Sequence, residues 1–357
     1  MNISKDLPRF FLFALIAGLV LILLKQWVGF SSDYDAAVTE RLNKEYEQSL
    51  LAEPDDVVGV SQTDTIRVVI DSLGGDIIEV ALLKHLSKQE EGAEPLLLLE
   101  KNRKRTYTAQ SGLIGPSGTE VKSAFARFDS AASNYVMQNQ EKLVVDLYFN
   151  DASGVRLTKR YTFKSNDYLI DVDYIVDNQS DSRWASTYYS QISRDDSADP
   201  GADSAGFGMQ SYLGAATTTN DDPYKKISFK EIKNKKTRFQ NTGGWVAMIQ
   251  HYFVSAWIPS PNENYNYYTK ETKSGLNVIG FLTPFAVEKN QTKTIGAKFY
   301  AGPKYQYRLQ EIAPNLDLTV DYGWLWWIAQ PLYTLLYFFA MGEAHMFGEV
   351  YEVFPGF

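Results

Sequence analysis

The chain has 357 residues, and its 45% of hydrophobic and 22% of charged residues give the balance of a globular protein that can bury a core. A formal charge of −8 and a pI of about 5.1 argue against a nucleic-acid partner, because the phosphate backbone favours clustered Lys and Arg. The absence of cysteine excludes a disulfide framework, a thiol nucleophile, a zinc–thiolate site and a lipid-modified N-terminal cysteine.

Residues 1–30 predict a membrane anchor. Lys5 and Arg9 precede Phe10–Leu24, an apolar run without a polar side chain. As a helix this run is shorter than the hydrocarbon core of about 30 Å, so the span extends further, with Lys25 snorkelling and Trp27 at the interface. No clear small-residue cleavage site follows, which favours an uncleaved signal anchor over a cleaved signal peptide. The basic residues keep the N-terminus cytoplasmic and place the rest of the chain across the membrane. The candidate anchor residues are Arg9, Phe10, Leu24, Lys25 and Trp27.

Residues 31–56 are polar and charged, with Pro54 near the end of the segment. This composition is typical of a solvated linker. A functional helix over residues 36–51 is the alternative interpretation.

From Asp64 onward the hydrophobic period changes to two, which predicts β-strands. Ile66, Val68 and Ile70 share one face of the first such segment, and a Gly74-Gly75 turn follows it. Further strands are predicted within residues 77–83, 142–149, 157–163, 168–178, 226–232, 245–257, 277–282 and 292–300. Many short alternating strands without intervening helices predict a mainly β fold, an antiparallel β-sandwich or a barrel, in a single domain.

Catalytic chemistry leaves no recognisable motif in the sequence. The histidines, His85, His251 and His345, fall in no metalloprotease or hydrolase motif. The acidic loop Asp195–Gly208 lacks the ligand spacing and the final Glu of a calcium loop. We therefore expect no enzyme, no catalytic residue, no cofactor and no metal site.

Four stretches in order give the chain a family resemblance. They are LGGDIIEVALLK (73–84), TYTAQSGLIG (106–115), GGWVAMIQHYFVSAWIP (243–259) and LDLTVDYGWLWWIAQPLYTLL (316–336). At these separations they resemble the YidC-type membrane protein insertases of Gram-negative bacteria. The resemblance covers roughly residues 8–338.

The resemblance implies a periplasmic β-sandwich at residues 57–316, similar in fold to the sugar mutarotases, with a short helix near Tyr305–Ala313. It also implies a location at the bacterial inner membrane. The implied partners are inner-membrane lipids, components of the Sec translocon and nascent membrane proteins, whose insertion and folding the family assists.

Residues 317–341 match the family's amphipathic helix on the periplasmic face of the membrane. The run Trp324–Met341 is uncharged, and Gln330-Pro331 interrupts it, which disfavours one continuous spanning helix. Tyr and Trp rings prefer the headgroup level, so an interfacial helix is favoured over a spanning one. The candidate membrane-interface residues are Trp324, Trp326, Trp327, Tyr333 and Tyr337.

Residues 342–357 match nothing in the family, whose members continue there into a bundle of five transmembrane helices. The second transmembrane helix of those proteins carries an arginine in a hydrophilic groove, whereas no arginine follows Arg308 here. We therefore expect a truncated insertase, through a shortened or frameshifted sequence, that cannot insert membrane proteins by itself.

Two other functions stay open. The implied fold is shared with mutarotases, so a membrane-anchored carbohydrate-binding or mutarotase-like protein is the alternative, although fold does not imply function. Sugar epimerisation would need an acid and a base facing one cleft, and only His85 and His251 are available in the domain. A membrane-tethered binding module unrelated to insertion is the third possibility.

Overall fold

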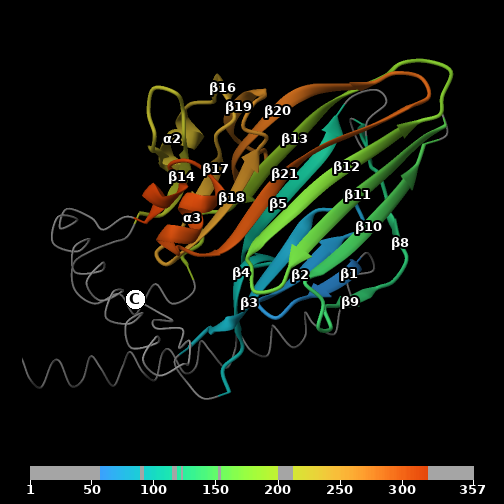
Figure 1. The fold of residues 1–357 in the computed structure, drawn as a ribbon. Coiled ribbons are helices and arrows are strands. Elements are labelled where there is room, and N and C mark those ends of the chain that lie inside the picture. The colour runs from blue at the N-terminus through green and yellow to red at the C-terminus, as the bar shows by residue number, and fades with distance from the viewer. Residues whose placement is uncertain are drawn as a thin grey trace, which may run out of the picture. The chain divides into compact units, whose positions relative to one another are not determined.

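A computed structural model of the chain describes residues 57–88, 92–114, 119–121, 124–151, 154–199 and 212–320. In this part of the chain two large, predominantly antiparallel β-sheets form the fold (Figure 1). The predicted anchor, the linker, the interfacial segment and the C-terminal tail lie outside the described residues. The prediction of a mainly β fold with antiparallel sheets is confirmed.

The first sheet has 12 strands. Its hydrogen-bonded order is β16 (Thr237–Thr242), β19 (Asn264–Glu271), β20 (Asn277–Val287), β13 (Trp184–Arg194), β5 (Thr106–Ile114), β4 (Pro95–Lys101), β3 (Ile77–Leu86), β2 (Ile66–Asp71), β1 (Val57–Gln62) and β9 (Asn134–Val136), and the short strand β6 (Glu120–Val121) pairs with β5 and with β7 (Ala124–Phe125).

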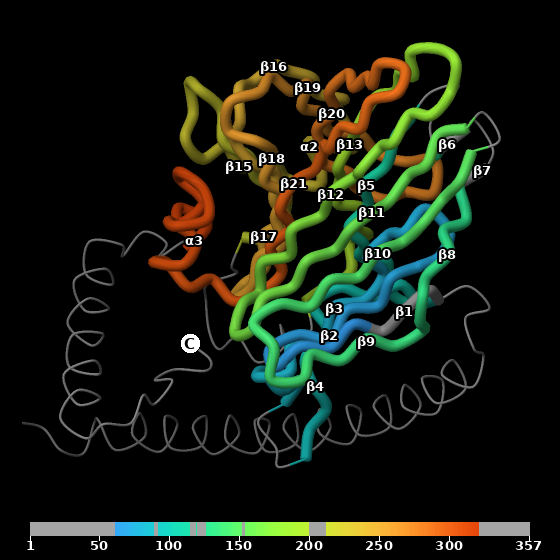
Figure 2. The backbone as a smooth tube through the Cα atoms, turned by 45° about the vertical axis from the view of Figure 1, so that its right-hand side comes forward, coloured from blue at the N-terminus to red at the C-terminus, as the bar shows by residue number. Residues whose placement is uncertain are grey.

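The second sheet has 9 strands, which Figure 2 shows as a layer beside the first. Its order is β15 (Lys225–Ile227), β14 (Gly214–Thr217), β17 (Val246–Ile249), β18 (Phe253–Pro259), β21 (Gln291–Pro303), β12 (Leu169–Asn178), β11 (Val155–Lys164), β10 (Lys142–Asn150) and β8 (Asp129–Ser130). Three short helical elements are described besides the strands: α2 (Phe229–Asn234), α3 (Gln306–Ile312) and the 3₁₀ turn η2 (Leu316–Thr319).

The core lies between the two sheets. Ile66, Val68 and Ile70 are buried, as their alternation predicts, and so are the matching residues of β12 from Ile170 to Val176. Aromatic rings join the layers: Tyr174 on β12 and Tyr188 on β13 meet edge to face, with centroids 5.9 Å apart. Period-two burial on both sheets therefore produces one continuous apolar layer.

A glycine turn occurs after β2, where the sequence predicts one, and a second glycine with a left-handed backbone precedes β17. Gly75, at φ +66°, follows β2, and a Cβ there would meet Cδ of Lys159 at 3.0 Å. Gly243, at φ +58°, precedes β17, and a Cβ there would lie 2.6 Å from the carbonyl oxygen of Pro261. Each position combines a left-handed backbone with close packing, which only glycine accommodates well.

The predicted strand over residues 226–232 is wrong in its second half. The strand ends at Ile227, and helix α2 begins after Ser228. Ser228 Oγ accepts a hydrogen bond from Glu231 N at 3.2 Å, and Glu231 Oε2 accepts one from Ser228 N at 2.7 Å. This capping box starts a helix at a place where the apolar alternation had predicted a strand.

The predicted strand over residues 245–257 is two strands, β17 and β18, joined by a tight turn. The N–H of Gln250 donates to the carbonyl of Phe253 at 3.0 Å and closes this turn. The turn residues Gln250, His251 and Tyr252 include no Gly, Pro, Asn or Asp, so the usual turn signals are missing there.

The chain leaves the sandwich through α3 and η2. The implied helix near Tyr305–Ala313 is present as α3, and Leu309 and Leu316 on these two elements are fully buried. Within the described ranges no helix is long and apolar enough to cross a membrane.

Candidate functional site

The structure does not place the residues that the sequence singles out for the membrane. The anchor candidates and the interface candidates all lie outside the described residues, so both remain predictions. These residues are Arg9, Phe10, Leu24, Lys25, Trp27, Trp324, Trp326, Trp327, Tyr333 and Tyr337. The described domain contains three other places where charge or exposed apolar surface is unusual.

The first is a fully buried lysine between the sheets. Lys159, on β11, donates from Nζ to the carbonyl oxygens of Gly74 at 3.1 Å and Ser111 at 2.9 Å, so one ammonium group ties β11 to the opposite sheet. The ammonium lies 5.1 Å from the ring centroid of Tyr174. Its ion-pair partner, Asp76 Oδ1, is 3.9 Å away.

Burial raises the pKa of Asp76, and the Lys159 ammonium partly offsets this effect. The carboxylate also accepts hydrogen bonds from Gln110 Nε2 at 3.0 Å and from Ser111 N at 3.3 Å. A buried pair with this many hydrogen bonds fixes the position of one sheet against the other. Both charges of the Lys159–Asp76 pair have their partners within the fold, which is typical of a structural site.

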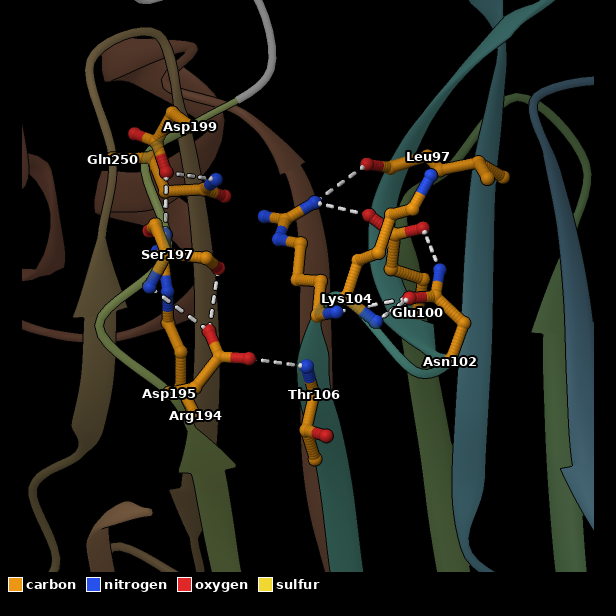
Figure 3. Close-up of polar contacts among 11 residues, drawn as sticks. Leu97, Glu100, Asn102, Lys104, Thr106, Arg194, Asp195, Ser197, Asp199 and Gln250 are labelled. Carbon is orange, nitrogen blue, oxygen red and sulfur yellow. Dashed lines mark hydrogen bonds and ion pairs between the residues drawn. The ribbon is translucent and has the colours of Figure 1, made fainter. Parts of the chain in front are cut away.

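The second place is an arginine cluster at the ends of β5 and β13. Arg194 is fully buried, and its Nη2 donates to Asp199 Oδ1 at 2.7 Å and to the carbonyl of Ser197 at 2.9 Å. Gln250 Nε2 donates to the same Asp199 oxygen at 2.6 Å. Figure 3 shows Arg194, Ser197, Asp199 and Gln250 gathered on one side, with Asp195 reaching across to the backbone N–H of Thr106.

Arg105 contacts the same tyrosine ring as Arg194. Its Nη1 donates to Glu100 Oε1 at 2.9 Å and to the carbonyl of Leu97 at 3.3 Å. The guanidinium carbons of Arg105 and Arg194 lie 5.4 Å and 4.8 Å from the ring centroid of Tyr107. The Tyr107 hydroxyl is 2.5 Å from Ser255 Oγ on the second sheet, so this ring also bridges the layers.

The two arginines keep unused hydrogen-bond donors. Among the residues that the structure describes, Nε and Nη2 of Arg105 and Nε and Nη1 of Arg194 have no hydrogen-bond partner. Each arginine nevertheless has its own carboxylate, so the cluster carries no obvious excess of positive charge. The cluster can therefore position oxygen acceptors, but its charge balance does not call for an anionic ligand.

The third place is the end of the sandwich at α3. Arg308, on α3, forms an ion pair with Asp167 in the turn between β11 and β12. Its Nη2 lies 2.6 Å from Asp167 Oδ2, and its Nε lies 3.4 Å from Asp167 Oδ1. Trp245, which is fully buried, donates from Nε1 to the carbonyl of Pro314 at 3.1 Å. These contacts hold the end of the described chain on the second sheet.

The histidines in the described domain lie among aromatic rings. His85 packs against Phe253 at 5.5 Å and against Tyr168 at 6.2 Å between ring centroids. His251 lies 4.0 Å from the ring centroid of Tyr252, and partial burial, followed by the charge of Lys304, lowers its pKa. No cluster of His, Asp and Glu that could hold a metal ion occurs within the described ranges.

Sequence reasoning missed the buried cations, although their signal was present. Lys159 has the same parity as Leu157 and Tyr161, so the alternation of β11 points its side chain inward. Arg194 follows Ile192 on the inward face of β13 in the same way. A charged residue in register with a buried apolar face predicts a buried polar site.

Comparison with solved structures finds mutarotase-like proteins at low similarity. One is a galactose mutarotase related enzyme from Lactobacillus acidophilus, with 11% identity, a TM-score of 0.43, and coverage of 68% of this chain and 96% of that one. Another is a galactose mutarotase-like protein from Lactobacillus casei, with 8% identity, a TM-score of 0.44, and coverage of 68% and 99%. At these scores the likeness carries no argument, and the description of the fold rests on the two sheets themselves.

Comparison with protein families and curated relatives is decisive. The fold defines the class of a two-sheet antiparallel β-domain, and the family model described as the YidC periplasmic domain matches residues 60–335. "Membrane protein insertase YidC" of Cellvibrio japonicus is 45% identical over 280 residues, covering 78% of this chain and 50% of that protein. The protein of the same name from Alcanivorax borkumensis is 40% identical over 300 residues, covering 82% and 52%.

The chain belongs to the YidC family of membrane protein insertases and contains its periplasmic domain. The resemblance noted in the sequence is thereby confirmed. The chain spans about half the length of the curated relatives that it matches. Those relatives are named as insertases, which are not classical enzymes.

Proposed function

We propose that the chain serves as the periplasmic part of a membrane protein insertase and chaperone at the bacterial inner membrane. The N-terminus is cytoplasmic, residues 1–30 anchor the chain, and the β-domain at residues 57–316 lies in the periplasm. Nascent membrane proteins are the substrates, and the domain contacts components of the Sec translocon. The observation that carries this proposal is the family match over residues 60–335.

Several features support the topology. Lys5 and Arg9 precede the apolar run Phe10–Leu24, and such a charge bias keeps the preceding end in the cytoplasm. The second membrane element is residues 317–341, which lies on the periplasmic surface as an interfacial helix because its rings prefer the headgroup level. Residues 317–341 follow in the chain closely after Arg308, which pairs with Asp167, and after Pro314, whose carbonyl accepts a hydrogen bond from Trp245.

These 357 residues alone do not suffice for insertion. The matched region is about half the length of the relatives. The family resemblance implies a substrate groove in the transmembrane helix bundle beyond that region. A substrate's polar segment needs a hydrophilic path into the bilayer, because uncovered charges are costly there.

Complementation of an insertase-depleted strain tests the proposal. We expect no growth from the 357-residue chain and restored growth from the same chain joined to the C-terminal half of the Cellvibrio japonicus relative. The C-terminal half expressed by itself measures what the periplasmic part adds. Growth with the 357 residues alone would overturn the claim of insufficiency, and a fusion that never rescues would overturn the assignment.

Topology is tested separately with protease added to spheroplasts. Digestion beyond Ser31 with survival of an N-terminal cytoplasmic tag is the expected result. Protection of the β-domain contradicts the periplasmic location, and a mature N-terminus near Ser31 contradicts the uncleaved anchor.

A further inference from the structure

Exposed apolar side chains gather at the end of the sandwich where the chain leaves it. Leu86 at the end of β3, Tyr252 in the turn between β17 and β18, and Tyr305 and Tyr307 at the start of α3 are 51%, 46%, 39% and 46% exposed. We call these four residues the exit patch. They come from three separate segments of the chain, so no single local sequence feature explains their common location.

Aromatic contacts and one backbone hydrogen bond link the segments that carry the exit patch. The ring of His85, next to Leu86, packs on Phe253 and on Tyr168. Tyr168 in turn meets Tyr305 with ring centroids 6.3 Å apart. The N–H of Lys304 donates to the carbonyl of Tyr252 at 3.0 Å, which fixes the turn against the start of α3.

The charges around the exit patch are mixed and largely offset. Asp167, in the turn before β12, and Glu311, on α3, both pair with Arg308. Lys84 donates to Asn166 Oδ1 at 2.7 Å, and Lys304 donates to the carbonyl of His251 at 3.1 Å. Tyrosine rings flanked by long cationic side chains are the composition found at the headgroup level of bilayers.

We propose that the exit patch rests on the lipid headgroups of the membrane surface, an inference that rests on the proposed function. Continuity of the chain supports this occupant, because η2 ends at Thr319 and the uncharged aromatic run Trp324–Met341 follows almost at once. The size of the patch also favours lipid over protein. A stable protein interface uses about 20–30 residues from each side, whereas contact with headgroups needs only a few amphipathic rings.

The absence of cysteine from the sequence gives a clean test. Single-cysteine variants Tyr307→Cys and Leu86→Cys in the full chain carry a spin label in the exit patch. Tyr148→Cys on β10, 43% exposed in the parent, and Leu73→Cys before β3, 39% exposed, are matched controls of the same residue types. Leu86 is the last residue of β3 and Leu73 precedes its first residue, and the strand is about 33 Å long at 3.3 Å per residue.

The four labelled chains are reconstituted in phosphatidylethanolamine–phosphatidylglycerol vesicles, and collisions with oxygen and with a water-soluble nickel chelate are measured. We expect the ratio of oxygen to nickel access to be at least about twofold higher at positions 86 and 307 than at positions 73 and 148, because the headgroup region excludes the chelate. Equal ratios at the four positions would overturn the proposal. Labels at 86 and 307 that are shielded from both reagents would mean that protein covers the patch, which also overturns it.

Flotation of the same samples with the vesicles tests the membrane-anchored function separately from the lipid contact of the exit patch. A chain that fails to float with vesicles overturns the membrane-anchored function and this inference together. A chain that floats while its patch labels behave like the controls leaves the proposed function standing and refutes the lipid contact alone.

Discussion

The buried lysine of β11 and the arginine cluster of β5 and β13 compensate differently for the loss of water around a buried positive charge. Lys159 sits among two carbonyl acceptors, a carboxylate and two tyrosine rings, which together replace the water it has lost. Arg105 and Arg194 have one carboxylate each but leave four guanidinium nitrogens unpaired within the described residues. Removing a cation costs most when its partners are left buried and unsatisfied, and costs less when some of its own donors were already without a partner. The first site should therefore support the fold much more than the second.

The largest expected loss of stability comes from replacing a buried tryptophan, which serves as a reference for the two charged sites. Trp245→Ala should lower the free energy of unfolding by about 3–5 kcal/mol, because a fully buried indole is replaced by a cavity. Urea unfolding of residues 57–320 followed by circular dichroism measures it, and we expect this segment to fold alone because its strands enclose their own core. A loss below about 0.5 kcal/mol is typical of surface positions and would contradict the packing described.

The second-largest loss of stability is expected from Lys159→Met, which tests the buried lysine site. We expect a loss of about 3 kcal/mol, because two carbonyl groups lose their donor and Asp76 loses its ion-pair partner while the volume is nearly kept. The double variant Lys159→Met with Asp76→Asn should recover part of this loss by removing the isolated carboxylate. A double variant no more stable than the single one would show that the charge of Asp76 is not the cause.

Arg105→Met tests the second side with the same kind of substitution. It should cost about 1 kcal/mol or less, because the change deletes two guanidinium nitrogens without hydrogen-bond partners and leaves Glu100, which is partly exposed, free to be hydrated. Arg194→Met serves as the internal control and should cost more than Arg105→Met, since Arg194 is fully buried and holds Asp199. If Arg105→Met destabilises the domain as strongly as Lys159→Met, the claim that the lysine site supports the fold more than the arginine cluster is wrong.

The smallest effect is a dependence on pH at Asp76. Burial raises the pKa of this carboxyl above its ordinary value of 3.8, so its contribution to stability is fully present below that pH and is lost as the pH rises through the folded-state pKa. Asp76→Asn removes this dependence. The difference in unfolding free energy between the Asn variant and the parent should therefore move in favour of the variant as the pH rises above 3.8. A difference that stays flat from acid to neutral pH would mean that the folded-state pKa is ordinary.

Much of the fold was predictable because one physical rule governs it. Alternation of apolar residues assigned the buried face of β2 and of β12 correctly, since only one register places those residues in the core. The rule failed at α2, where the local capping by Ser228 and Glu231 outweighs the alternation. It failed again at Gln250–Tyr252, where the turn is closed by the backbone alone.

The candidate sites were harder to predict for a different reason. Exposed patches such as Leu86, Tyr252 and Tyr307 arise from segments far apart in the sequence, and no local pattern brings them together. The pairing of Arg308 with Asp167 likewise joins residues separated by 141 positions. Such contacts are properties of the topology and become visible only when the sheets are assembled.

The location of the exit also determines how the domain would bear a mechanical load. A pull on the chain at Val320 passes through η2 and α3 into β21, which is hydrogen-bonded to β12 along one edge and to β18 along the other. A force along the axis of a strand paired on both edges loads many hydrogen bonds in shear at the same moment, so none can be broken singly. Tension applied at Val320 would thus reach the interior of the second sheet, where β12 and β18 are themselves paired on their other edges with β11 and β17.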